Sequence, residues 1–197
     1  MNILARFVTI GQGVSSRWRN LYYRILGVRL HGYVLMRRIE IPRNYQDIEI
    51  CARAALDRGV VLLSTGPADG TIRIRIGPDT YINRNTMLDA TESLEIGSNC
   101  AIGPGCYLTD HDHGLDPSLP PLGQPMMSAP TRLGNEVWLG ANVVVLKGVT
   151  IGDRAVIGAG SVVSRDIPPG AVAVGFPARI VRFRIEEDSV DKVLVQS

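Results

Sequence analysis

Two of the three histidines in this chain stand close together, in the run TDHDHG that spans residues 109–114. Imidazole is the side chain whose ordinary pKa, about 6.5, lies nearest to neutral pH, so either His111 or His113 can accept a proton there. Asp110, Asp112 and Asp116 are near enough in sequence to orient the two rings or to change the charge around them. These residue types at this spacing predict general-base catalysis.

Metal binding and a purely structural role are the two alternatives for this run. Histidine and aspartate at short spacing bind metals in many proteins. The remaining histidine, His31, stands alone in the N-terminal part of the chain, so the sequence supplies no further cluster of histidines and we expect no bound metal. The other interpretation is that a histidine merely caps a turn of the loop.

The elements that must position this loop repeat with a period of six residues. A branched aliphatic residue recurs every six positions within three runs, at Ile76, Ile82 and Leu88, at Ile96, Ile102 and Leu108, and at Leu133, Leu139, Val145, Ile151, Ile157 and Val163. Glycine follows the aliphatic residue in most of these hexads. A helix repeats its apolar face about every 3.6 residues and a strand every 2, so neither explains this period.

A coiled parallel sheet does explain it. If each hexad supplies one short strand and one corner, three hexads close a triangular coil, and the aliphatic residue points into a narrow prism. Each coil then buries its apolar side against the coils above and below, as in a solenoid. Cys100 and Cys106 occupy the fifth position of their hexads, which predicts small buried residues rather than nucleophiles.

Three longer runs accompany the hexads, namely IGPDTYINRNTMLDATESLEIG, WLGANVVVLKGVTIGDRAVIGAGSVVSRDIPPG and GFPARIVR. Together they resemble the galactoside, maltose and polysaccharide O-acetyltransferases of the hexapeptide-repeat family. The resemblance implies an all-β solenoid, a left-handed parallel β-helix with a long protruding loop, and its hand comes from the resemblance alone. We therefore expect an N-terminal segment at 1–47, the β-helix at 48–183 with an extended catalytic loop at 109–132, and a tail at 184–197.

The resemblance also implies roles for residues of the loop and the corners. In this family a histidine removes a proton from the acceptor, which then attacks the thioester carbonyl of acetyl-CoA. The family's register places that histidine at His113, and the His-Asp-His pattern leaves His111 as an alternative. Acceptor contacts map onto Asn83, Asn85 and Asp89, although asparagines at the corners of a solenoid can equally serve to stabilise turns.

The same register implies a coenzyme site on the C-terminal coils. The residues mapped onto it are Ala141, Ala159, Ser164, Arg165, Arg179, Arg182 and Trp138. The arginines suit this role because a guanidinium pairs well with phosphate oxygens. Trp138 would lie beside the acetyl or pantetheine group, although a lone tryptophan often only packs.

We therefore expect an acetyl-CoA-dependent O-acetyltransferase acting on a sugar or polysaccharide unit. The alternatives are N-acetylation of a nucleotide-linked amino sugar and a catalytically inactive solenoid used as a scaffold. Members of the family place the catalytic loop of one subunit against a coil of its neighbour, so the resemblance also implies a homotrimer.

The N-terminal segment contains a second pattern. Trp18, Leu21, Tyr22 and Ile25 recur at helical spacing, Ser16 can cap the start of a helix, and Gly27 can end it. The predicted short amphipathic helix would cover the open end of the solenoid. The alternative is that it lies on an anionic membrane, because its other side carries the basic residues Arg17, Arg19 and Arg24.

The net charge and the composition exclude some classes of partner and some cellular settings. The formal net charge is +2, from 21 Lys and Arg against 19 Asp and Glu, which is too small an excess for a protein whose main partner is nucleic acid. Three cysteines without a CxxC spacing argue against a disulfide framework, and no apolar run reaches the roughly 18 residues of a membrane span. We expect a cytoplasmic protein that touches a membrane at most on its surface, with a small-molecule or glycan acceptor.

Overall fold

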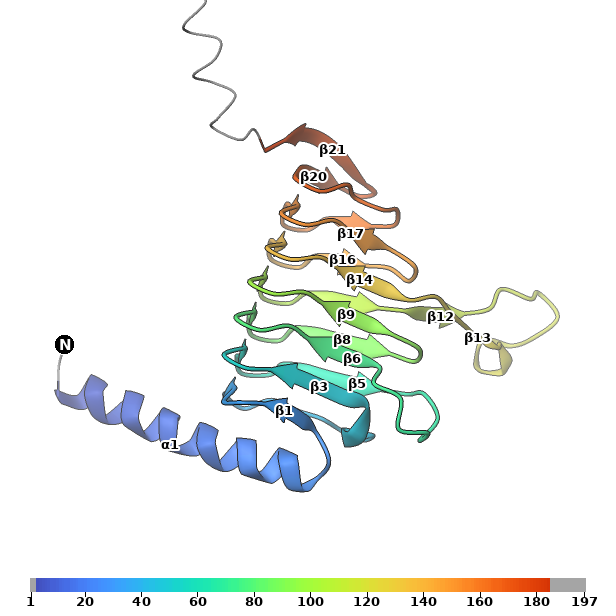
Figure 1. The fold of residues 1–197 in the computed structure, drawn as a ribbon. Coiled ribbons are helices and arrows are strands. Elements are labelled where there is room, and N and C mark those ends of the chain that lie inside the picture. Colours follow the sequence, from blue (N-terminus) through green and yellow to red (C-terminus); the bar gives the residue numbers. More distant parts are fainter. Residues whose placement is uncertain (1–2, 185–197) are drawn as a thin grey trace, which may run out of the picture.

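The structure is a computed structural model that describes residues 3–184, with side chains described from residue 13 onward. One helix, α1 (Ile3–Ile25), lies at the base of a stack of short strands, which rises away from it (Figure 1). Three sheets run along the stack and form the faces of a prism. The chain is a left-handed parallel β-helix, as predicted.

The strands fall on three faces, called A, B and C here. Face A consists of β1 (Arg29–His31), β3 (Ile48–Cys51), β6 (Ile74–Ile76), β9 (Leu94–Ile96), β14 (Thr131–Leu133) and β17 (Thr150–Ile151). Face B consists of β2 (Leu35–Met36), β4 (Ala55–Leu56), β7 (Tyr81–Ile82), β10 (Ala101–Ile102), β15 (Trp138–Leu139), β18 (Val156–Ile157), β20 (Ala171–Gly175) and β21 (Ala178–Phe183). Face C consists of β5 (Val61–Ser64), β8 (Met87–Ala90), β11 (Tyr107–Thr109), β16 (Val144–Val145) and β19 (Val162–Val163).

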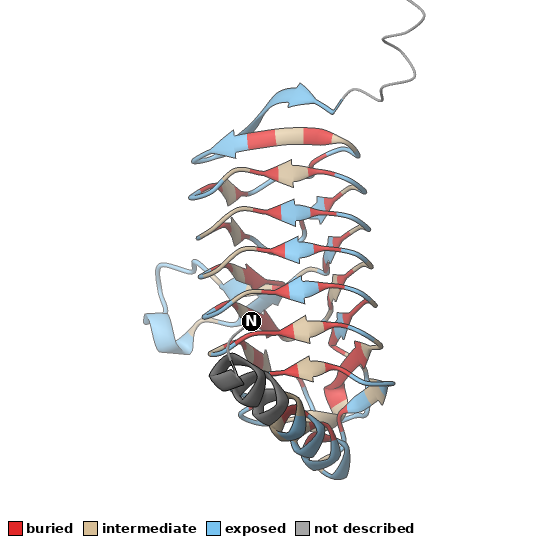
Figure 2. Cartoon of the chain, turned by 90° about the vertical axis from the view of Figure 1, so that its left-hand side faces the viewer, coloured by how far each residue is buried: buried red, intermediate tan, exposed pale blue. Residues whose placement is uncertain are grey.

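The predicted inward positions form the core. None of the twelve aliphatic residues of the regular hexads is more than 1% exposed. Cys100 and Cys106 are also buried, at 2% and 1% exposure, and burial raises the pKa of both thiols, which fits a packing role. Figure 2 shows the buried positions recurring from coil to coil along the side of the stack that faces the viewer.

The stack begins earlier than the predicted boundary at residue 48. Strands β1 and β2 already pair in parallel with β3 and β4, so residues 29–36 belong to the first coil. This coil lacks the glycine-marked hexads of the later ones, which is why the sequence pattern did not reveal it. The predicted tail falls mainly on residues 185–197, which lie outside the described part of the chain.

The helix α1 corrects two expectations. It begins at Ile3, so Ser16 is not an N-cap but a buried residue in the middle of the helix. It does cover the base of the stack, but with Ser16 and Asn20 rather than with the apolar residues chosen from the sequence. Its end at Ile25 agrees with the predicted stop, because Gly27 adopts a φ of 110° that favours glycine. Within residues 3–184, no helix is both long enough and apolar enough to span a membrane.

The predicted long loop is partly regular. It leaves the stack after β11 and contains an antiparallel hairpin, β12 (His111–His113) and β13 (Met126–Ser128), which protrudes sideways from the prism (Figure 1). A 3-10 turn at Pro121–Gly123 lies in the connection between the two strands, and another, at Tyr45–Asp47, precedes β3. The hairpin therefore holds both histidines on one short strand.

Candidate active site

The hairpin that carries the histidines is fixed where it leaves the stack, at the corner between faces C and A. The amide of Ala129 donates to the carbonyl of Asp110 at 2.8 Å. The hydroxyl of Thr131 donates to the carbonyl of Thr109, also at 2.8 Å. These bonds join the two ends of the hairpin where it leaves the stack and where it returns, so they fix the starting position of β12.

Asp110 links this hairpin to the coil beneath. Its side chain is fully buried, and its carboxylate accepts hydrogen bonds from the backbone amides of Thr91, Glu92 and Ser93 at 2.6–2.8 Å. One carboxylate oxygen also lies 2.9 Å from Nδ1 of His111. If Nδ1 carries the proton of this bond, Nε2 of His111 is left as the proton-accepting nitrogen.

His111 lies beside two further polar groups on face C. Its Nε2 is 3.9 Å from Oδ1 of Asp89, and its side chain is 11% exposed. The other Asp89 oxygen accepts a hydrogen bond from the Tyr107 hydroxyl at 3.0 Å, whereas Oδ1 is buried and has no hydrogen-bond partner among the described residues. Burial raises the pKa of Tyr107, and the Asp89 carboxylate adds to that rise, so the phenol remains a donor.

Tyr107 is the residue of this cluster that the sequence did not reveal. It occupies an outward position of its hexad, next to the inward Leu108, and outward positions carry no period that marks them. The structure places it one coil above Met87, which brings its hydroxyl within reach of Asp89.

His113, two residues along the same strand, is exposed and lies in an open hollow of about 550 Å³. Lys147, from the corner of the next coil, lines this hollow and donates to Asp112 at 2.7 Å and to the carbonyl of Met127 at 3.1 Å. A base at His113 would therefore be accessible and would have a cation nearby. Within residues 13–184, no side chain hydrogen-bonds to the His113 ring.

The predicted acceptor residues divide into two places. Asp89 lies with His111, but Asn83 and Asn85 lie at the preceding corner, between faces B and C. Asn85 has a left-handed φ of 58°, and the Asn83 side chain accepts a hydrogen bond from the amide of Arg84 at 2.8 Å. Both asparagines thus act as corner residues here, a role that their short polar side chains suit.

The predicted coenzyme residues also divide between places. Ala141 and Ala159 occupy equivalent positions of successive coils at the corner between faces B and C, joined by a hydrogen bond from the Gly160 amide to the Ala141 carbonyl at 2.8 Å. Ser164 and Arg165 are exposed at the corner between faces C and A, on the same edge of the prism as the histidine hairpin. A single chain therefore does not bring all of these residues together.

The remaining coenzyme candidates lie on face B. Arg179 and Arg182 are exposed on the last strand, β21. Trp138 is 58% exposed on β15, so it does not pack in the core. All three side chains are exposed in the single chain.

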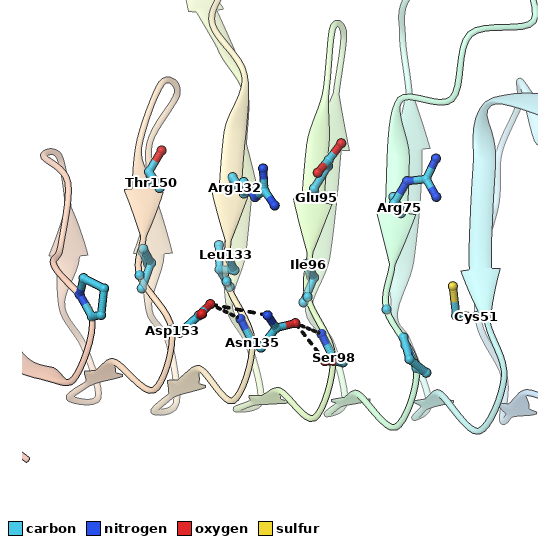
Figure 3. Close-up of a pocket in the computed structure, with 17 residues that line it drawn as sticks. Cys51, Arg75, Glu95, Ile96, Ser98, Arg132, Leu133, Asn135, Thr150 and Asp153 are labelled. Atoms are coloured by element: carbon cyan, nitrogen blue, oxygen red, sulfur yellow. Dashed lines mark hydrogen bonds between the residues drawn. The ribbon is translucent and has the colours of Figure 1, made fainter. Parts of the chain in front are cut away.

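A separate groove of about 740 Å³ runs along face A (Figure 3). Its outward row alternates in charge, with Arg75, Glu95 and Arg132 in register on neighbouring strands. Its one thiol, Cys51, has a pKa raised by burial and by Glu49, which makes it a weak nucleophile. None of the predicted site residues lines this groove. The candidate active site is therefore at the hairpin, which holds both histidines.

The part of the chain with described side chains contains no group of three His, Cys, Asp or Glu residues that could hold a metal ion. The carboxylates nearest the histidines are instead engaged with backbone amides, Tyr107 or Lys147.

The chain is similar to known acetyltransferases. A family model described as bacterial transferase hexapeptide (six repeats) matches residues 130–165. The galactoside O-acetyltransferase of Escherichia coli strain K12 is 44% identical over 109 residues, which cover 55% of this chain and 53% of that protein. The galactoside O-acetyltransferase of Lactococcus lactis subsp. lactis strain IL1403 is 37% identical over 114 residues, covering 57% of this chain and 54% of that protein. The chain thus spans about half the length of these curated relatives.

A solved structure matches over a larger share. It is a hexapeptide-repeat containing acetyltransferase from Vibrio cholerae O1 biovar eltor, complexed with acetyl coenzyme A, with a TM-score of 0.56 and 34% sequence identity. The match covers 65% of this chain and 72% of that one. With this identity over more than two thirds of a solved member, and with the matching repeat and coil, the chain belongs to the hexapeptide-repeat acetyltransferase family.

Proposed function

We propose that this protein transfers an acetyl group from acetyl-CoA to a hydroxyl of a sugar or polysaccharide unit, with a histidine of strand β12 as the general base. The observation that carries the proposal is the hairpin itself, which presents an accessible histidine beside His111 and its hydrogen-bonded partner, the buried Asp110. Membership of the family supports the transfer of an acetyl group. The two galactoside O-acetyltransferases among the relatives support a sugar hydroxyl as the acceptor.

The reaction needs one proton acceptor and no covalent enzyme intermediate. The histidine takes the proton of the acceptor hydroxyl as its oxygen attacks the thioester carbonyl carbon. The tetrahedral intermediate then breaks its carbon–sulfur bond, and the imidazolium returns the proton to the departing coenzyme A thiolate. Atoms and charge balance, since one ester and one free thiol form from one alcohol and one thioester.

We assign the role of base to His113 because a base must be reached by the acceptor. His113 is exposed in its hollow, whereas the His111 ring is largely covered and its Nε2 lies 3.9 Å from Asp89. His111 and Asp110 then fix the position of strand β12, and His113 accepts the proton of the acceptor hydroxyl.

Assembly into a homotrimer would complete the site. The outward rows of faces B and C are largely apolar in the middle of the stack, namely Tyr81, Ala101, Trp138 and Val156 on face B and Met87, Tyr107, Val144 and Val162 on face C. The outward row of face A is charged. A triangular prism with two apolar faces and one charged face suits a closed ring in which face B of one subunit meets face C of the next. Such a ring would bring Trp138, Arg179 and Arg182 on face B of one subunit near the hairpin of another.

Release of free thiol from acetyl-CoA, measured across a panel of glycosides, glycans and amino sugars, tests this function. The proposal expects thiol release that depends on a hydroxyl acceptor, with transfer to oxygen verified by mass spectrometry of the product. Release with amino sugars alone would replace it by N-acetylation. No acceptor-dependent release from any member of the panel would favour the inactive scaffold.

A further inference from the structure

The helix α1 attaches to the stack through a polar side. The Ser16 hydroxyl accepts a hydrogen bond from the Met36 amide at 2.9 Å, and the Asn20 side chain bonds to both the amide and the carbonyl of Val34, at 3.0 and 2.7 Å. The Tyr23 hydroxyl donates to the carbonyl of Ile39 at 3.1 Å. These three buried residues recur at helical spacing and fix which side of α1 faces the first coil.

Over residues 14–25, the opposite side of α1 is apolar and exposed. Its residues, which we call the outer stripe, are Val14 (49% exposed), Trp18 (68%), Leu21 (51%), Tyr22 (56%) and Ile25 (76%). At about 100° per residue these five positions form one continuous stripe, directed away from the base of the prism. A contiguous patch of large apolar side chains on an otherwise well-packed protein is typical of a contact surface.

Positive charge flanks the outer stripe on both sides. Helical spacing places Arg17 and Arg24 along one flank and Arg19 along the other. Arg24 is held against the first coil by hydrogen bonds to the carbonyls of Leu30 and Gly32. No acidic residue occurs within Ile3–Ile25, so nothing on the helix offsets these charges.

A shallow hollow of about 410 Å³ lies on the same side, lined by Ser15, Trp18, Arg19 and Tyr22. Two aromatic rings beside a guanidinium suit the boundary between lipid headgroups and acyl chains, where aromatic side chains keep one edge in polar surroundings. Arginine flanks around an apolar stripe are the arrangement of helices that lie in the plane of that boundary.

We propose that α1 docks this protein onto an anionic membrane surface through the outer stripe. The charge of the flanks favours an anionic bilayer over a neutral one. Because the outer stripe faces away from the stack, the docked prism would stand on the bilayer with its coils rising from it, as the arrangement in Figure 1 indicates. This inference does not depend on the proposed acetyl transfer.

Flotation of the full chain with lipid vesicles tests the proposal. We expect it to float with vesicles that contain phosphatidylcholine and about 30 mol% phosphatidylglycerol, but not with phosphatidylcholine alone, and to bind less at about 0.5 M salt. Replacing Trp18→Ser together with Ile25→Ser should weaken this binding by about tenfold or more. The matched control is Val181→Ser, since Val181 is 58% exposed at the far end of the stack and should bind as the unchanged chain does.

Two arginine substitutions test the contribution of charge to vesicle binding, and each variant is checked for folding. Arg17→Gln should weaken binding to the anionic vesicles, whereas Arg58→Gln, an exposed arginine away from α1, should not. Circular dichroism and thermal unfolding establish that each variant keeps its fold. Absence of flotation with anionic vesicles, or undiminished binding of the Trp18→Ser, Ile25→Ser variant, would overturn the proposal.

Trp18 fluorescence separates a membrane from a second copy of the chain. The sequence has two tryptophans, so a Trp138→Phe background leaves Trp18 as the reporter. We expect its emission to shift to shorter wavelength only when anionic vesicles are added. Emission that is already shifted without lipid, together with a change of sedimenting mass in the Trp18→Ser, Ile25→Ser variant, would assign the outer stripe to a protein contact instead.

Discussion

Asp110 is the residue on which the order of the candidate site depends. Its buried carboxylate receives three backbone amides of one coil and bonds to the imidazole of the next, so it fixes both a corner and the orientation of His111. A carboxylate is needed for this role because all four of its partners can act as donors.

Substitution of Asp110 by asparagine should therefore be costly. The side-chain NH2 group of asparagine would face backbone N–H groups that are also donors. At least one buried N–H group would then lose its hydrogen bond. We expect the free energy of unfolding to fall by about 1–3 kcal/mol in urea titration. The control is Asp112→Asn, which removes an exposed ion pair with Lys147 and should cost less than about 1 kcal/mol. Equal losses for the two variants would refute the special role of Asp110.

Arg179 and Arg182 allow a test of the predicted coenzyme site. Both are exposed on β21, and neither has an ion pair within the described residues, so each can serve a ligand. If they hold coenzyme phosphates, Arg179→Ala should raise KM for acetyl-CoA while hardly changing KM for the acceptor. The measurement is steady-state kinetics with each substrate varied in turn. A similar rise in both constants would indicate a structural role.

The sequence predicts the coils of the stack, but it does not predict which outward side chains meet between coils. The inward aliphatics and corner glycines recur because every coil solves the same packing problem, so a period of six identifies them from sequence. Tyr107 and Asp89 meet only because two coils stack in a particular register. That register depends on how strands align across the stack, which no residue spacing within one coil reveals.

The helix shows the limit of periodicity in another way. The helical spacing of Trp18 and Ile25 correctly predicts an apolar side of the helix, but the spacing does not indicate whether that side packs against the stack. The helix instead buries Ser16 and Asn20 against the first coil, where Asn20 bonds to the backbone of Val34 and Ser16 accepts from the amide of Met36. The end of the solenoid would otherwise leave these backbone groups without a partner. The need to pair those groups outweighed the apolar pattern.

Asp57 joins three successive coils near the base. It accepts hydrogen bonds from Arg37 in the coil below at 3.3 Å and from the Tyr81 hydroxyl in the coil above at 3.1 Å. Burial by itself raises the pKa of this carboxyl, but the Arg58 amide, Tyr81 and Arg37 together lower it below its ordinary value of 3.8. The ionised form is thus favoured in the folded state.

The sign of the pH effect follows from this lowered pKa. A carboxyl with a depressed folded pKa stabilises the protein above its unfolded pKa, and that stabilisation is lost as pH falls through the folded value. We expect Asp57→Asn to lower the free energy of unfolding at pH 5–7, and the gap to the unchanged protein to close below about pH 3.8. Denaturant titrations at several pH values measure this gap. A gap that stays constant down to acid pH would contradict the assignment.

The three faces of the prism differ in the character of their outward residues. The alternating charges of face A suit water, while the apolar rows of faces B and C suit contact with other subunits. The predicted coenzyme residues are spread over two corners and face B, and this spread has the same explanation if the two sides of a subunit boundary each supply part of the site.

We expect a homotrimer on this basis. Sedimentation velocity at micromolar concentration should give a mass three times that of the 21.4 kDa chain. Trp138→Glu, which puts a charge on the exposed row of face B, should shift the distribution toward smaller species, whereas Arg132→Glu on face A should not. A fully active monomer at this concentration would exclude the arrangement.

The kcat of thiol release from acetyl-CoA shows whether a histidine of strand β12 acts as the general base. His113→Ala should lower kcat by roughly 10²- to 10⁴-fold with little change in acetyl-CoA affinity, and His111→Ala should cost less. His31→Ala, a histidine paired with Glu49 on face A, is the matched control, and a chelator should change none of these values. If His113→Ala keeps near-normal turnover while His111→Ala is inactive, the base is His111 and the assignment is wrong by two residues; if both keep it, no histidine of this strand is the base.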